Sequence, residues 1–203
     1  MKKFIRTCLV FSLVFPLTLL VPLSSQSDQS PLAEMVRALA EGDLPSLRDA
    51  CRKEFPPHVE DSRMYGLFVA ALEEGKVEEA ERTLSELEGK YPDSFFIDYG
   101  KTRLGAYFYF SGEKGKGARL VKEVRRRPLS FREGALHAFL RGLVLLGEGD
   151  ASGGMRELAR CVSTYPGSQE SERAWEKFRA LTQMKDISPE PETVLLVASA
   201  LEG

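Results

Sequence analysis

The sequence predicts an all-α protein in which helical hairpins stack side by side as a solenoid, with a further helix capping its C-terminal end. Three observations predict this fold. Glycines recur at Gly42, Gly75, Gly112 and Gly149, which are separated by 33, 37 and 37 residues. Apolar residues recur every three to four positions on both sides of these glycines, and a proline closes each unit. A closed bundle needs no such marks at a near-constant interval, so the pattern favours a stack.

Residues 1–26 differ in composition from the rest of the chain. Three cations, Lys2, Lys3 and Arg6, precede a run without charge over residues 8–23, and a Ser-rich polar stretch follows. This order of a basic start, an apolar run and a small polar region is typical of a secretory signal peptide. We therefore expect the protein to be exported, to a periplasmic or extracellular location.

Two details of this segment refine the expectation. Pro16 and Pro22 interrupt the apolar run, which favours a cleaved signal over a membrane-spanning helix. Cleavage is expected near Ser25 or Ser27, with an uncleaved anchor as the alternative. Cys8 lies at the beginning of the apolar run and not at its end, so the segment lacks a lipobox.

Length and charge place the remaining chain among ordinary globular domains. The 203 residues suffice for one domain with a core, and the net charge of −2 does not indicate nucleic-acid binding. An exported protein can form disulfides. We nevertheless expect Cys51 and Cys161 to be buried free thiols, because each lies on the apolar face of a helix in a different unit.

Residues 28–185 carry the repeated units. The units span, in order, 28–57, 61–94, 98–131 and 135–168, and a single helix follows within 168–185. Each anchor glycine is expected to end the first helix of its unit in a left-handed conformation. The small residue five positions later (Ala80, Gly117 or Gly154) allows the second helix to approach the first closely.

The C-terminal tail, residues 186–203, begins with a Pro-containing linker and ends with an apolar run over 194–201. A helix that caps the last repeat is expected there, since a terminal repeat otherwise leaves an apolar face bare. The alternative is that the tail docks in the protein's own groove.

The repeated unit resembles the tetratricopeptide repeat, a helix–turn–helix of about 34 residues. The resemblance covers residues 28–185 and is carried by Leu67, Gly75, Ala80 and Pro92 in one unit and by Gly142, Gly149, Leu158 and Pro166 in another. The unit 98–131 matches at Leu104, Gly105, Phe108 and Gly112, but it has an early Pro128 and Gly117 where the family has Ala.

Two junctions between units narrow the resemblance. "KYPDS" at 90–94 and "TYPGS" at 164–168 each lead into the next helix. They are similar to junctions in bacterial envelope repeat proteins, such as outer-membrane assembly lipoproteins and Tol-Pal-associated cell-division coordinators. The resemblance implies a scaffold or adaptor of the bacterial cell envelope that binds a protein or peptide.

The family resemblance also implies a binding face lined by the first helices. Its partner-reading positions fall on Tyr65, Val69, Tyr99, Thr102, Arg103, Tyr109, Phe139 and Leu143, with Leu72, Ala106 and Leu146 beside them. These residues are mostly aromatic or aliphatic, and the Lys and Asn of carboxylate-clamp repeats are missing. An apolar partner segment is therefore expected. The alternative is that these side chains pack between adjacent helices.

Catalysis is not expected from this sequence. His58 and His137 lie in separate units, and His137 is expected on an outward helix position. The sequence contains no nucleophile–base arrangement, phosphate-binding loop or metal-ligand spacing. We therefore predict a non-catalytic protein without cofactor or metal. The basic run at 124–128 is expected to end a helix, where cations interact favourably with its dipole. The alternative is that it contacts an anionic envelope surface. The alternative function is a carbohydrate-binding or enzyme-associated module of a cell-wall machine, with the aromatic helix 95–111 as a stacking platform.

Overall fold

A computed structural model describes residues 30–125, 130–183 and 189–201. The expected signal peptide, the part of the basic run at 126–128 and the linker before residue 189 lie outside the described residues. Arg125, which is described, follows the C-terminal end of a helix at Glu123, as the sequence predicts.

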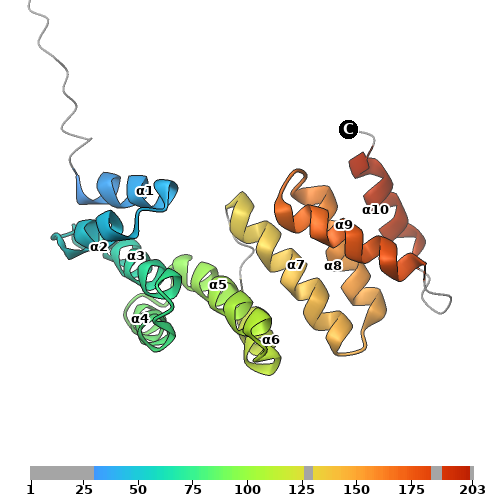
Figure 1. The fold of residues 1–203 in the computed structure, drawn as a ribbon, viewed down its shortest axis with the longest axis horizontal. Helices are drawn as coiled ribbons and strands as arrows, with labels where there is room; N and C mark the ends of the chain where they lie inside the picture. Colours follow the sequence, from blue (N-terminus) through green and yellow to red (C-terminus); the bar gives the residue numbers. More distant parts are fainter. Residues whose placement is uncertain (1–29, 126–129, 184–188, 202–203) are drawn as a thin grey trace, which may run out of the picture.

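The described residues are helical and contain no strand, which confirms the predicted all-α fold. Short turns join most of the helices, and neighbours in the chain pack against one another (Figure 1). The α-helices are α1 (Pro31–Glu41), α2 (Leu44–Arg52), α3 (Glu60–Glu73), α4 (Val77–Lys90), α5 (Phe96–Ser111), α6 (Lys114–Glu123), α7 (Phe131–Gly147), α8 (Ala151–Thr164), α9 (Gln169–Thr182) and α10 (Pro191–Leu201), and a short 3₁₀ helix η2 (Pro57–Val59) precedes α3.

The helices pair as hairpins, in the order that the repeats predict. The pairs are α1 with α2, α3 with α4, α5 with α6, and α7 with α8, and α9 follows as a single helix. The first helices also pack against one another, α1 on α3, α3 on α5, α5 on α7 and α7 on α9, so they form one row. This row is the feature that distinguishes a solenoid from a closed bundle.

The anchor glycines have the predicted backbone conformation. Gly42, Gly75, Gly112 and Gly149 have φ values of 71°, 73°, 104° and 86°. This left-handed region is costly for residues with a Cβ atom. Each glycine therefore allows a sharp reversal between the two helices of its hairpin.

The close helix approach that the small residues predict is most marked in α5 and α6. A Cβ atom on Gly117 of α6 would lie 2.6 Å from the backbone nitrogen of Tyr109 and 2.7 Å from the carbonyl oxygen of Gly105. Gly154 of α8 is similarly tight against α7, where its Cβ would lie 2.6 Å from a side-chain carbon of Leu146. These contacts confirm that small residues set the spacing within the hairpins.

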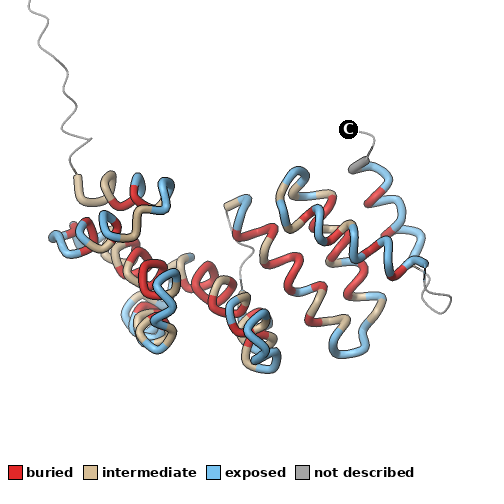
Figure 2. Tube along the Cα trace, viewed as in Figure 1, coloured by how far each residue is buried: buried red, intermediate tan, exposed pale blue. Residues whose placement is uncertain are grey.

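The buried apolar side chains form two clusters. The first runs from Met35 in α1 to Phe108 in α5, and the second runs from Ala138 in α7 to Val197 in α10. Figure 2 shows buried segments in both groups of helices. The solenoid therefore has two cores along its length.

Helix α10 caps the C-terminal end, as the fold prediction states. It packs against α8, and Val197 is buried within the second cluster. Ser152 and Arg156 of α8 bind the Glu190 carboxylate just before α10, at 2.6 and 2.8 Å. The tail thus packs on α8, which is the second helix of its hairpin, and not on the row of first helices.

The expectation that His137 points outward is wrong. The side chain is buried between α7 and α6, and its Nε2 atom lies 3.4 Å from the carbonyl oxygen of Val121. Burial lowers the pKa of His137, although the contact with Val121 opposes this effect. Cys51 and Cys161 are buried free thiols, as predicted.

Candidate partner-binding site

A hollow of about 500 Å³ lies against the row of first helices. Its walls come from α1, α3, α5 and the N-terminal turn of α7, together with the start of α2. The lining residues are Val36, Ala38, Leu39, Ala40, Gly42, Leu44, Leu47, Tyr65, Val69, Glu73, Tyr99, Arg103, Arg132 and Glu133. Helices α1 and α7 belong to different hairpins, so residues far apart in the sequence form this hollow together.

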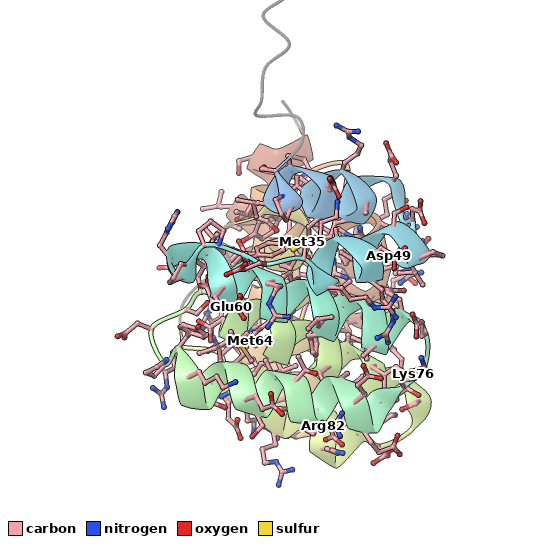
Figure 3. All side chains as sticks on the ribbon, turned by 90° about the vertical axis from the view of Figure 1, so that its left-hand side faces the viewer. Met35, Asp49, Glu60, Met64, Lys76 and Arg82 are labelled. Atoms are coloured by element: carbon pink, nitrogen blue, oxygen red, sulfur yellow. The ribbon has the colours of Figure 1, made fainter. Side chains whose placement is uncertain are left out.

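A second hollow of about 240 Å³ adjoins the first. It shares Glu73, Arg103, Arg132 and Glu133 with the first hollow. It adds, as further lining, Leu72, Tyr107, Leu136 and Glu170. In the view from the N-terminal end (Figure 3), Met35 of α1 and Arg82 of α4 lie toward opposite sides of the stack. Arg82 is exposed and lines neither hollow, so it marks a surface away from the site.

One wall of the first hollow is apolar and well packed. The Tyr65 ring stacks on Phe96 with the ring centroids 4.7 Å apart, and it contacts Tyr99 edge-on at 6.0 Å. Tyr65 and Tyr99 are buried, so they present only small areas to the hollow. Val36 of α1 is 54% exposed and is the most exposed large apolar residue of the lining. A partner can bury it without rearranging the core.

A second part of the lining is charged, and most of its charges are already paired. Arg103 donates from Nη2 to Oε1 of Glu133 at 2.8 Å, and its Nη1 lies 3.6 Å from Glu73. Glu133 also interacts with Ser130, which caps the N-terminus of α7 through a bond from the Glu133 backbone nitrogen at 3.2 Å. Ser130 thus caps α7, and its own backbone nitrogen donates to the Tyr99 hydroxyl at 2.7 Å, so the cap ties this wall to α5.

The electrostatics keep the Arg103–Glu133 pair ionised. Burial alone would raise the pKa of Glu133, but the Ser130 hydrogen bond and Arg103 outweigh it, so this pKa lies below its usual value. Burial would also lower the pKa of Arg103, yet Tyr65, Glu133 and Glu73 together raise it overall. Arg132 is exposed at the rim and forms no ion pair within the part of the chain that the structure describes.

Four of the residues that the sequence predicts as partner-binding lie together at the hollow. Tyr65 and Val69 come from α3, and Tyr99 and Arg103 come from α5. Val69 is buried like the two tyrosines. Most of each of these side chains therefore packs between helices, as the alternative in the sequence analysis states. Their contribution to a partner contact is limited to the edges that face the hollow.

The other four predicted residues lie elsewhere. Thr102 is fully buried, and its hydroxyl donates to the Asp98 carbonyl oxygen at 2.8 Å, so it faces the core. The Tyr109 hydroxyl donates to the Leu143 carbonyl oxygen at 3.1 Å and thereby joins α5 to α7. Phe139 and Leu143 line a separate hollow of about 350 Å³ against α9.

The sequence analysis missed several lining residues. Val36 and Leu39 belong to the most degenerate unit, where the repeat register is hardest to assign. Arg132 and Glu133 lie before the unit that begins at residue 135. The spacing Ser130-x-x-Glu133 is nevertheless a capping-box signal that marks the start of α7 and the position of this wall.

None of the helices in 30–125, 130–183 and 189–201 combines the length and apolarity needed to cross a membrane. No family model matches the chain, and neither a curated protein nor a solved structure matches it.

Proposed function

We propose that this chain is an exported, non-catalytic scaffold or adaptor of the tetratricopeptide-repeat kind that binds a protein or peptide partner in the bacterial cell envelope. The hollow on the row of first helices is the observation that carries the proposal. Support for export comes from the signal-like residues 1–26, and support for the envelope comes from the Tyr-Pro junctions at 90–94 and 164–168.

The size and lining of the hollow favour an apolar segment. Its volume of about 500 Å³ falls within the range of roughly 300–1,000 Å³ that is usual for ligand sites. Val36 and the partly buried Leu39 supply apolar surface that a partner can cover. Glu133 and Glu73 both face Arg103, so the charges of these three residues are compensated within the protein and a strongly charged partner is not required. One or two apolar side chains of a peptide fit this environment.

A peptide selection tests the proposal. The full chain without its first 26 residues is immobilised, and random dodecamers displayed on phage are selected against it. We expect enriched peptides that carry large apolar residues. Their binding should fall with Val36→Glu, which places a charge on the apolar wall, and should persist with Arg37→Glu. Arg37 is the exposed neighbour of Val36 on α1 and does not line the hollow.

A second pair of variants probes the adjoining hollow. Tyr107 is 39% exposed and lines that hollow, whereas Phe110 is 57% exposed on the same helix and lines neither hollow. Tyr107→Ala should weaken the selected peptides, and Phe110→Ala should leave their binding unchanged. A selection without enrichment, or equal losses in lining and control variants, would contradict the proposed function.

The exposed rings of α5 support a carbohydrate-binding module as the second candidate. Tyr107 and Phe110 present accessible aromatic surface from the helix that the sequence predicts as a stacking platform. Pull-down on immobilised peptidoglycan fragments distinguishes the two functions. In that assay the second candidate predicts a loss with Phe110→Ala, whereas the peptide-binding proposal predicts no retention of the wild-type protein.

A further inference from the structure

Helix α10 presents an apolar surface to solvent. The helix lies at the C-terminal end of the stack, beside α8 (Figure 1). Val194, Leu195 and Leu196 are exposed, and Leu195 is 68% exposed. Among the described helices, α10 is the only one that exposes three large apolar side chains in succession. Contiguous apolar surface of this kind marks an interaction site, whereas single exposed apolar residues do not.

The geometry of α10 places Leu195 at the centre of this surface. Thr193 and Val197 are buried, and α10 packs against α8, so these two residues mark the inner side of the helix. An α-helix turns by about 100° per residue, so positions two before and two after Leu195 lie about 160° around the helix from it. Leu195 therefore points away from α8.

An apolar outer side is unusual for a helix that caps a solenoid. A terminal repeat normally has a polar outer face, which keeps the end of the stack soluble. The only charged residue of α10 is Glu192, in its first turn. The inner side of α10 contributes Val197 to the second core, while the outer side stays apolar. The cap therefore offers an interface of its own.

The outer face of α10 is complementary to itself in shape. Ala198 and Ser199 are exposed, and they lie one turn beyond Leu195 and within about 60° of it around the helix. When two copies meet antiparallel about a two-fold axis, each Leu195 lies over these small residues of the other copy. The Ser199 hydroxyl already donates to the Leu196 carbonyl oxygen at 3.0 Å, so its burial leaves no donor unsatisfied.

The charges around α10 favour a second copy over a lipid surface. Residues 193–199 carry no charge, so two copies of this face meet without like-charge repulsion. Glu190, just before the helix, is compensated by Arg156 of α8 at 2.8 Å. Helices that lie on membrane surfaces carry Lys and Arg on their polar face, and α10 contains neither.

We propose that the outer face of α10 is a self-association surface, through which two copies of this chain pair antiparallel about a two-fold axis with Leu195 at the centre. An 11-residue helix is about 16 Å long and buries less than the roughly 800 Å² per partner of a standard interface. The dimer is therefore weak and forms reversibly as the protein concentration rises. No residue of α10 lines either hollow, so this proposal and the proposed function stand or fall separately.

Sedimentation velocity over a wide range of protein concentration tests the proposal. The protein without residues 1–26 is suitable, because this truncation removes none of the described helices. We expect the wild type to shift from monomer toward dimer as its concentration rises. Leu195→Glu removes two leucines from the interface and places two like charges there. It should raise the Kd of the dimer by about a hundredfold or more, so that this variant stays monomeric.

Two variants serve as matched controls. Phe110→Glu puts the same charge in place of another exposed large apolar residue, on α5 and away from α10 (Figure 1). Val36→Glu does so in the first hollow. Both should dimerise as the wild type does. Circular dichroism verifies that each variant stays helical, and Leu195→Ala provides a milder change that should still weaken the dimer.

Amide chemical shifts of the isotope-labelled protein, compared between dilute and concentrated samples, locate the contact. We expect changes with concentration at Leu195, Ala198 and Ser199. A wild type that stays monomeric at every concentration would overturn the proposal. A dimer that persists in Leu195→Glu and is lost in Val36→Glu would also overturn it, because association would then occur through the hollow. Binding of a monomeric wild type to phospholipid vesicles, with loss of binding in Leu195→Glu, would show that a lipid surface covers α10 instead.

Discussion

Substitution of Gly117 by Ala tests the predicted packing of the hairpins. In α6 the added Cβ atom would lie 2.6 Å from the Tyr109 nitrogen, 2.7 Å from the Gly105 carbonyl oxygen and 2.9 Å from the Tyr109 Cα atom. All three atoms belong to the backbone of α5. A change of side-chain rotamer therefore cannot relieve the clash, and α6 must move away from α5.

The matched control is Gly115→Ala in the same helix. A Cβ atom on Gly115 meets no atom within 4 Å. This variant therefore gains part of the helix propensity of Ala over Gly, less than about 1 kcal/mol because Gly115 is the second residue of α6, without a packing cost. Gly117→Ala lies farther inside α6 and gains about 1 kcal/mol in helix propensity, but it also incurs overpacking, which typically costs about 1–3 kcal/mol. Since the clash is with backbone atoms, we place it at the upper end, and the net destabilisation is about 2 kcal/mol.

Urea denaturation followed by circular dichroism measures both variants. We expect Gly117→Ala to lower the unfolding midpoint at an unchanged m value, and Gly115→Ala to raise it. In a thermal scan the destabilisation corresponds to a Tm lower by about 4–8 °C for a chain of this size. Equal stability of Gly117→Ala and the wild type, or shifts of both variants in the same direction, would refute the close approach of α5 and α6.

Three further predictions follow from the ionisable groups. The pKa of Glu133 is lowered in the folded state, so its contribution to stability is complete above its ordinary value of 4.5 and is lost as the pH falls through the folded value. Denaturation measured against pH should therefore show that Glu133→Gln loses less stability at acid pH than the wild type does. An equal loss in both proteins would contradict the ion pair. The pKa of His137 is lowered from 6.5, so the unfolded chain binds the extra proton and stability falls as the pH drops below 6.5. This loss of stability below pH 6.5 should be absent in His137→Gln. If the variant loses the same stability, His137 is not the cause and the prediction is wrong. Burial raises the pKa of Cys51 to about 11 and that of Cys161 to about 12, so both should react with a thiol reagent only as the chain unfolds; rapid modification of the native protein would show that they are accessible.

The sequence predicted the features of the fold that depend on local backbone chemistry. Gly75 and Gly149 mark left-handed turns because few other residues accept that conformation. Gly117 and Gly154 mark close approach because a side chain there would clash with the neighbouring helix. These requirements are local to one hairpin, so a single sequence displays them.

The position of His137 was predicted incorrectly because it depends on a neighbouring element. The local pattern around His137 predicts an outward position. Helix α6 of the preceding hairpin packs against α7 and covers the imidazole, which lies beside the Val121 carbonyl. Such a burial depends on how another hairpin packs, which the local pattern around His137 does not contain.

The candidate site was predicted in part for a similar reason. Tyr65 and Arg103 were identified because they lie at fixed positions of the first helices. Val36 and Arg132 were missed because they line the same hollow from hairpins far apart in sequence. Their proximity results from the packing angles summed over several repeats, and those angles depend on side-chain packing that a sequence pattern does not specify.

The most direct test of the central claim is an amide chemical-shift map of the isotope-labelled protein, titrated with a selected peptide. The account predicts that the largest shift changes occur at residues lining the two hollows, such as Val36, Val69, Tyr107 and Arg132, on α1, α3, α5 and α7. Changes concentrated on the second helices α4, α6 and α8, with these amides unaffected, would contradict it.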